Sequence, residues 1–177
     1  FASAAIRPDL LARHFFIGVN DTLNGLQSLA RWYRSLFTGP LVGITGSNGK
    51  TTTKEMLASI LGRRGPVLKS EGNLNNHIGL PLSLLRLDLS DRAAVLEMGI
   101  SRLGEMGPLC DMANPTVGVI TNIGRAHLES LVDLKGVAME KQVLFDAIGP
   151  NGAVVINRDD LNLAQWEGQA RERWTYA

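Results

Sequence analysis

Apolar runs and amphipathic stretches alternate along the chain, which predicts buried strands separated by helices. Near-continuous runs of Val, Ile, Leu and Ala predict strands at residues 41–45, 67–69, 93–98, 117–122 and 153–157, with one more short strand at 15–19. Apolar residues at helical spacing predict helices at residues 22–37, 50–63, 79–87, 104–113 and 134–147. This alternation is typical of an α/β fold, with a mostly parallel sheet and helices on both faces.

Local signals mark where these helices begin and end. Asp21 or Thr22 is placed to cap the first helix, and the Thr38-Gly39-Pro40 segment ends it. Gly65-Pro66 ends the second helix. A length of 177 residues with 45% hydrophobic content is sufficient for one domain with a proper core, and not comfortably for two.

The charge balance and the single cysteine narrow the class of protein. Lys and Arg number 18 against 17 for Asp and Glu, so the chain lacks the basic surface of a nucleic-acid binder. No apolar run approaches the length of a membrane span. Cys110 lies in an apolar helical stretch, where we expect a core residue and not a nucleophile. A single cysteine fits a reducing compartment such as the cytoplasm.

The segment from Gly46 to Thr53 follows a predicted strand directly and combines glycines, a lysine and hydroxyl groups. Glycines let backbone N–H groups point at an anion, the start of the next helix carries partial positive charge, and Lys50 adds a full charge. Thr51 is placed to offer a hydroxyl to a magnesium ion carried by bound phosphates. The common Walker form needs a glycine where Ile44 stands. A turn that only caps a helix is the alternative.

Two further strand ends carry candidate metal ligands. Glu97 lies at the end of the strand at 93–98, a position suited to a magnesium ligand, directly or through water. A salt-bridged surface glutamate is the alternative. His127 follows the strand at 117–122 and is a candidate ligand for a second metal ion or a phosphate, although a single histidine is often structural.

The loop at residues 71–81 is rich in neutral polar groups, with Asn73, Asn75, Asn76 and His77 between two glycines. Amide side chains both donate and accept hydrogen bonds, so the loop suits orientation of phosphate oxygens or metal-bound waters better than acid–base chemistry. Asn73 and Asn76 are our candidates for this role. Turn formation with helix capping is the alternative.

Four motifs, taken together and in order, resemble the central ATP-binding domain of the Mur ligases, the enzymes that build the peptide of bacterial cell-wall precursors. They are the segment Thr45 to Thr52, the loop Gly72 to Pro81, Glu97-Met98-Gly99, and the segment Thr121 to Glu129. The resemblance covers about residues 41–160. Within the family, the asparagine-rich loop and the triple threonine most resemble the branch that joins D-alanyl-D-alanine to UDP-N-acetylmuramoyl-tripeptide.

The resemblance implies a role for each matching position. The ATP phosphates would be bound by Gly46, Ser47, Asn48, Gly49, Lys50, Thr51 and Thr52. Lys50 would stabilise charge on the transferred phosphoryl group. Thr51 and Glu97 would hold a first magnesium ion and His127 a second. Lys141 matches the family's carbamylated lysine, whose carbamate helps to hold that second ion, so Lys50, His127 and Lys141 would be catalytic.

The neighbours of Lys141 depart from the family pattern, because Glu140 and Gln142 stand where small residues are expected. Helical spacing nevertheless puts Lys141 on one face with Val137 and Leu144. Carbamylation requires burial and a metal ion that favour the neutral amine, since only that form reacts with CO2. A solvated lysine on a helix surface is the alternative.

The reaction implied by the family is acyl activation. ATP phosphorylates the terminal carboxylate of UDP-N-acetylmuramoyl-tripeptide, the amine of D-alanyl-D-alanine attacks the acyl phosphate, and inorganic phosphate leaves. Two unit charges about 4 Å apart repel by about 4 kcal/mol at an effective dielectric of about 20, so Mg²⁺ and Lys50 are needed to bring carboxylate and triphosphate together.

The three-domain layout of Mur ligases also implies a domain organisation. Residues 1–38 are expected to be the tail of the N-terminal domain and its connecting helix, and residues 39–177 an incomplete central domain without the C-terminal domain. We therefore expect no ligase activity from this chain alone. One alternative is a related ATP-dependent ligase of the folylpolyglutamate or cyanophycin type. The other is a non-catalytic nucleotide-binding module, against which the presence of Lys50, Glu97 and His127 argues.

Overall fold

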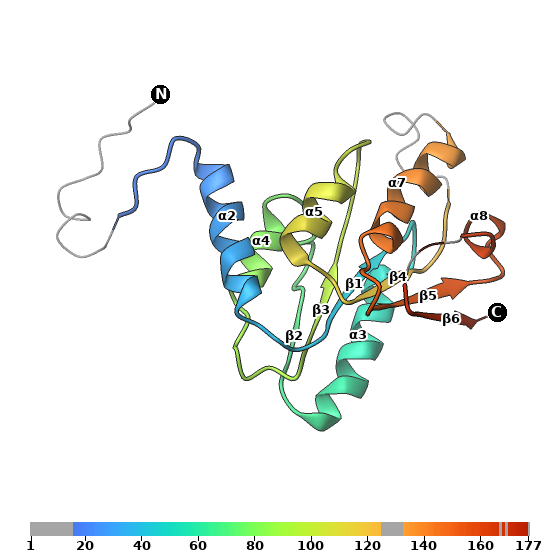
Figure 1. The fold of residues 1–177 in the computed structure, drawn as a ribbon, viewed down its shortest axis with the longest axis horizontal. Coiled ribbons are helices and arrows are strands. Elements are labelled where there is room, and N and C mark those ends of the chain that lie inside the picture. Colours follow the sequence, from blue (N-terminus) through green and yellow to red (C-terminus); the bar gives the residue numbers. More distant parts are fainter. Residues whose placement is uncertain (1–15, 125–132, 167, 169, 177) are drawn as a thin grey trace.

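The computed structural model describes residues 16–124, 133–166, 168 and 170–176, which form one sheet with helices on both faces (Figure 1). The strands are β1 (Leu41–Thr45), β2 (Val67–Lys69), β3 (Ala93–Glu97), β4 (Val117–Ile120), β5 (Ala153–Asn157) and β6 (Glu172–Tyr176). The helices are α2 (Thr22–Ser35), α3 (Lys50–Leu61), α4 (Gly79–Leu84), α5 (Met106–Ala113), α7 (Leu134–Asp146) and α8 (Leu161–Ala164), with a 3-10 turn at Gly62–Arg64. The strand order is β2-β3-β1-β4-β5-β6, and all neighbouring strands are parallel.

The predicted α/β fold with a parallel sheet is confirmed, and most predicted elements lie where the apolar pattern placed them. The strands at 41–45, 67–69 and 153–157 have the predicted bounds, and those at 93–98 and 117–122 end slightly earlier. The five predicted helices are all present, each slightly shorter than predicted. Asp21 caps α2 as expected, since its side chain accepts a hydrogen bond from the Asn24 amide.

The prediction of a strand at 15–19 is wrong for the described residues 16–19, which form no strand and have exposed side chains. An apolar run becomes a strand only where a partner strand and a core are available to it. In contrast, β6 and α8 were not predicted. All five residues of β6 are exposed and none of them is Val, Ile or Leu, so no apolar run marks this strand, and α8 is too short to show helical spacing.

Each face of the sheet has its own hydrophobic core. On one face, α3 packs against β1, β2 and β3, above the buried side chains of Val42, Ile44, Val95 and Val119. On the opposite face, α4 and α7 contact the sheet, α5 lies against both helices, and α2 forms an outer layer on α4 and α5 (Figure 1). Among the described residues, no helix combines the length and the apolar character that crossing a membrane requires.

Arg34 joins the outer helix α2 to the rest of this face. Its buried guanidinium group donates hydrogen bonds to three main-chain carbonyls, those of Ala113 (2.7 Å), Phe37 (2.8 Å) and Asn114 (2.9 Å). Two of these acceptors lie at the carboxyl end of α5, where helix carbonyls have no partner within the helix. Arg34 therefore holds α5 in place from its carboxyl end, while the other end of α5 faces the candidate site.

The strand order places three loop-bearing strand ends side by side. β1 lies between β3 and β4. After β1 the chain forms β2 and β3 on one side of β1, and then β4, β5 and β6 on the other side. Ile44 is paired with Glu97 across one border of β1, and Thr45 with Ile120 across the other. Such a switch in direction opens a crevice at the carboxyl ends of the strands, which is where ligands bind in sheets of this type.

Candidate active site

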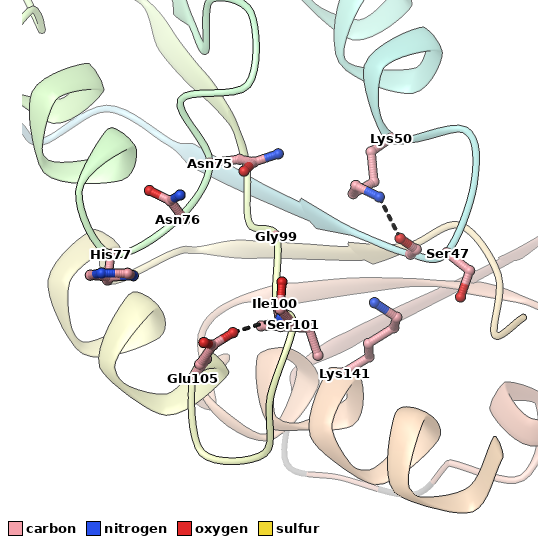
Figure 2. Close-up of a pocket in the computed structure, with 11 residues that line it drawn as sticks. Ser47, Lys50, Asn75, Asn76, His77, Gly99, Ile100, Ser101, Glu105 and Lys141 are labelled. Carbon is pink, nitrogen blue, oxygen red and sulfur yellow. Dashed lines mark hydrogen bonds between the residues drawn. The ribbon is translucent and has the colours of Figure 1, made fainter. Parts of the chain in front are cut away.

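A cavity of about 290 Å3 lies at these strand ends, where the loops after β1, β2 and β3 meet α7 (Figure 2). Its lining is Gly46, Ser47 and Lys50 from the first loop and helix α3, Asn75, Asn76 and His77 from the second loop, Gly99, Ile100, Ser101 and Glu105 from the third, and Lys141 from α7. The Glu105 carboxylate accepts hydrogen bonds from the Ser101 and Arg102 amides at 2.6 and 3.1 Å. The remaining groups are mainly cations, amides and hydroxyls, so the cavity suits an anion.

The loop from β1 to α3 has the backbone conformation of a phosphate-binding turn. Gly46 and Gly49 have φ values of 145° and 80°, which side chains rarely permit. A Cβ atom at Gly46 would also overlap the Thr121 hydroxyl. Gly49 is the N-cap of α3 and offers no side-chain cap, so the N–H groups of the first helical turn have no acceptor within the helix. These N–H groups are available to an anion.

Thr121 and Asn122, directly after β4, hold this loop from the other side. The Ser47 amide donates to the Asn122 main-chain carbonyl, and the Asn48 amide to the Asn122 side-chain oxygen, both at 3.0 Å. The Thr121 hydroxyl donates to the Asn48 carbonyl at 2.5 Å. Two of the predicted phosphate-binding amides, those of Ser47 and Asn48, are therefore engaged in this structure, and the first turn of α3 provides the open donors.

Lys50 is positioned by its own loop. Its ammonium group donates to the Gly46 carbonyl at 2.7 Å, which keeps the side chain folded back over the phosphate loop. Burial lowers the pKa of Lys50, and the negative charge of Glu97 opposes that shift. The charge of Lys50 thus faces the cavity from a position that is already ordered.

Lys141 faces the same cavity from the opposite wall (Figure 2). It is only 3% exposed, so the alternative of a solvated surface lysine is wrong. Its neighbours on the predicted apolar face, Val137 and Leu144, are buried as well. Burial lowers the pKa of Lys141 to about 8, with a further contribution from the charge of Lys50, while Glu140 acts in the opposite direction. A lysine with this pKa is partly neutral near physiological pH, which a carbamylation site requires.

The two residues that depart from the family pattern both have structural partners. Glu140 is buried, and its carboxylate accepts hydrogen bonds from the Met106 amide at 2.7 Å and the Gly104 amide at 2.8 Å, at the start of α5. The Gln142 side chain donates to the Asn162 carbonyl at 2.8 Å and so joins α7 to α8. Glu140 thereby fixes the loop that precedes α5 against the helix that carries Lys141.

Glu97 lies at the end of β3, next to the cavity, and is 2% exposed. The alternative of a salt-bridged surface glutamate is wrong about the surface, but the salt bridge is present, since Lys54 Nζ lies 3.1 Å from Glu97 Oε1. Glu97 Oε1 is nevertheless a buried oxygen without a hydrogen-bond partner, and so is the Thr45 hydroxyl, which lies on the opposite face of the sheet. A buried carboxylate oxygen without a hydrogen-bond donor is suited to bind a cation.

The asparagine-rich loop combines both of the functions that its composition allowed. Asn76 lines the cavity, yet its side-chain oxygen accepts from the Ile78 and Gly79 amides at 3.1 and 2.9 Å and so caps α4. Asn73 is exposed and does not line the cavity. Asn75, which we did not predict, lines the cavity, and its carbonyl accepts from the Gly99 amide at 2.8 Å. Its sequence neighbours Asn73 and Asn76 gave the same signal, so composition alone cannot separate the three.

The structure brings only some of the predicted site residues together. Gly46, Ser47, Lys50, Asn76 and Lys141 line the cavity, and Glu97 is buried beside it. Asn48, Gly49, Thr51 and Thr52 belong to the same turn but are exposed outside the cavity. His127 lies outside the described residues. Among the described residues, no group of three or more His, Cys, Asp or Glu side chains is arranged to hold a metal ion.

The prediction that Cys110 is a core residue is confirmed. Cys110 is buried in the core, and burial raises its pKa to about 12, which excludes a reactive thiolate.

The residues at the site that we did not predict come from two loops and from helix α3. His77, Ser101 and Glu105 reach the cavity from two different loops. Lys54 follows Lys50 by one helical turn, and that spacing is the only signal in the sequence that could have identified it.

We expect Gly46→Ala to lower the free energy of unfolding by about 2–4 kcal/mol, because the new Cβ meets the Thr121 hydroxyl and the backbone conformation is unfavourable for alanine. Urea denaturation measures the difference. Gly62→Ala is the matched control, since Gly62 has an ordinary helical φ of −60° and nothing within 4 Å of an added Cβ. Equal unfolding free energies in the two variants would contradict the close approach.

The pKa of Lys141 is about 8 in the folded chain, against 10.5 for a lysine in the unfolded chain. We therefore expect the contribution of Lys141 to the free energy of unfolding to increase between these two pH values. In this window the unfolded chain still binds the proton that the folded chain has lost, so deprotonation favours folding. Wild type should therefore gain on the order of 2 kcal/mol relative to Lys141→Met across the window, as measured by urea denaturation. The same comparison with exposed Lys135→Met should give no such gain, and equal gains would refute the pKa assignment.

Comparisons with known proteins agree on one family. Residues 44–177 match the Mur ligase middle domain. A UDP-N-acetylmuramoyl-tripeptide--D-alanyl-D-alanine ligase of Bacillus subtilis is 42% identical over 153 residues, which are 86% of this chain and 34% of that protein. A MurF structure from Acinetobacter baumannii has a TM-score of 0.81 at 37% identity and covers 84% of this chain and 33% of its own. The MurF ligase from Thermotoga maritima in complex with ADP has a TM-score of 0.80 at 38% identity, with 90% and 37% covered. This chain spans about a third of the length of these relatives, and it belongs to the Mur ligase family.

Proposed function

We propose that this chain provides the ATP-binding part of a ligase that joins D-alanyl-D-alanine to UDP-N-acetylmuramoyl-tripeptide. The observation that carries the proposal is the pair of lysines, Lys50 and Lys141, that face one cavity beside the open first turn of α3. Lys50 and the helix N-terminus form an environment that stabilises a polyanion such as a triphosphate, and Lys141 would act there as a carbamate that holds a metal ion. The ADP complex of the Thermotoga maritima relative supports the choice of nucleotide.

We assign the phosphates to the turn between β1 and α3. The N–H groups of Lys50, Thr51 and Thr52 have no acceptor within the helix, so they are available to phosphate oxygens. Gly46 and Gly49 permit the close approach that this contact needs. Lys50 is held over the loop by the Gly46 carbonyl and would move to the phosphoryl group that is transferred.

We further assign a magnesium site to Thr51 and Glu97, on the two sides of the same crevice. The buried Glu97 oxygen that lacks a hydrogen-bond partner fits a divalent cation, since hard cations such as Mg²⁺ bind carboxylate oxygens. When bound, Mg²⁺ would neutralise part of the charge on the phosphates. A second ion would be held by His127 and a carbamylated Lys141, and Glu140 would keep the helix of Lys141 in register with the loop before α5.

The choice of substrate rests on the names of the relatives. The Bacillus subtilis protein and the two MurF structures favour the D-alanyl-D-alanine branch over a folylpolyglutamate- or cyanophycin-type ligase. In this proposal, residues 1–38 connect to the domain that binds the UDP-sugar, and residues 39–177 belong to the central domain. Competition between D-alanyl-D-alanine, glutamate and aspartate as acceptors in the full-length protein would distinguish these substrate classes.

We expect Lys50→Ala to abolish magnesium-dependent binding of a non-hydrolysable ATP analogue, as measured by calorimetric titration, and to lower kcat of the full-length ligase by about 100-fold or more. The reason is that Lys50 supplies the full charge nearest to the phosphate loop. Lys135→Ala, an exposed lysine on α7, is the control and should bind as wild type does. Unchanged nucleotide binding by Lys50→Ala would refute the assignment of the phosphate site.

We expect Lys141 to carry a carbamate when the full-length protein is incubated with ¹³C-labelled bicarbonate and magnesium. The buried amine with a pKa of about 8 is partly neutral under these conditions and can react with CO2. A carbamate carbon signal in the ¹³C NMR spectrum should appear in wild type and in Lys135→Ala. Its presence at equal intensity in Lys141→Arg would show that the modified residue is another lysine.

A further inference from the structure

Lys54 is a buried lysine that the proposed function does not use. It lies one helical turn after Lys50 on the side of α3 that faces the sheet, and it is 2% exposed. Its ammonium group lies 3.1 Å from Glu97 Oε1 and 3.2 Å from Glu55 Oε1. Glu97 is buried, whereas Glu55 is on the surface and also forms an ion pair with Lys69.

The contact between Lys54 and Glu97 balances charge without making a hydrogen bond. The two charged atoms are within ion-pair distance, yet Glu97 Oε1 has no hydrogen-bond partner. A buried carboxylate needs a nearby positive charge, because removing an ion from water is costly and leaving it unpaired costs more. Lys54 meets this need by charge alone, so another cation at the same place could replace it.

Lys54 also has a second anionic partner close by. The ammonium group of Lys54 has a second carboxylate in Glu55, to which it stays paired if Glu97 turns to another ion. The end of β3 therefore presents a buried carboxylate oxygen whose counter-ion, Lys54, can be exchanged.

We propose that Lys54 is a positioning residue that holds the Glu97 carboxylate in place before a divalent cation binds, and that it competes with the cation for this carboxylate. The proposal rests on the magnesium site assigned above. It has two consequences that oppose each other. Lys54 stabilises the empty site, since it compensates the buried charge, and it weakens the affinity for the cation, since a second positive charge remains close by.

The test compares wild type, Lys54→Met and Lys69→Met in the full-length protein. Thermal unfolding is recorded in excess EDTA and in saturating magnesium chloride, and Mg²⁺ is titrated calorimetrically in the presence of a non-hydrolysable ATP analogue. Lys54→Met should melt lower than wild type by roughly 5 °C or more in EDTA, because Glu97 loses its counter-ion. Its Tm should rise further than that of wild type when Mg²⁺ is added, and its Kd for Mg²⁺ should fall on the order of tenfold.

Lys69→Met is the matched control, because Lys69 shares the partner Glu55 but has no contact with Glu97. It should have the wild-type rise in Tm with Mg²⁺ and the wild-type Kd. Equal magnesium responses in wild type and Lys54→Met would overturn the proposal.

Two more variants keep the test decisive if Lys54→Met does not fold. Lys54→Arg retains the charge and should keep the wild-type Kd for Mg²⁺, so a tenfold tighter Kd would overturn the proposal. The double variant Lys54→Met/Glu97→Gln removes both charges and should fold in EDTA with no rise in Tm on adding Mg²⁺. If it is no more stable than Lys54→Met in EDTA, Lys54 does not act through Glu97.

Glu97→Gln alone separates this proposal from the one on which it rests. If wild type binds Mg²⁺ no more tightly than Glu97→Gln does, the assigned magnesium site is wrong. If Glu97→Gln weakens binding and Lys54→Met leaves it unchanged, only the role of Lys54 is wrong.

Discussion

The parallel register that places β1 between β3 and β4 is the constraint on which the rest of the site depends. It aligns Ile44 with Glu97 and Thr45 with Ile120, so the residues that follow each strand meet at one edge of the sheet. The contact between the Gly46 backbone and Thr121 follows directly from this alignment. A shift of one residue would turn each side chain to the opposite face of the sheet and separate the phosphate loop from Glu97.

Some of the charged side chains at this edge of the sheet are paired with a partner and others are not, and this difference affects which ligand the cavity can bind. Lys54 is paired with Glu97, and the Glu140 carboxylate is satisfied by two main-chain amides before and at the start of α5. Among the described residues, no carboxylate lies within ion-pair distance of Lys50 or Lys141. Lys50 therefore faces the cavity as a cation without a paired carboxylate in the described part of the chain, in a partly buried setting where an anion gains more than it would in water. The low pKa of Lys141 has the same origin, since burial and a like charge both favour the neutral amine.

Much of the fold could be predicted because buried strands in a parallel sheet are marked by composition. The runs at 41–45 and 153–157 are apolar up to their last residues, Thr45 and Asn157, and their bounds were predicted correctly. β6 could not be predicted, since its five exposed residues form a strand only through hydrogen bonding to β5. The apolar residues at 16–19 show the reverse case, in which apolar character is present but no strand forms.

The sequence by itself determined the chemistry of the phosphate loop, because glycine, lysine and threonine act there through backbone conformation and helix geometry, which are local properties. It also determined that Lys141 lies on an apolar helix face. Only the tertiary structure decided which asparagine of the loop at 71–81 reaches the cavity, and that Glu97 is paired with Lys54. These contacts join residues of different elements, and their formation depends on sheet order and packing, which no local pattern in the chain encodes.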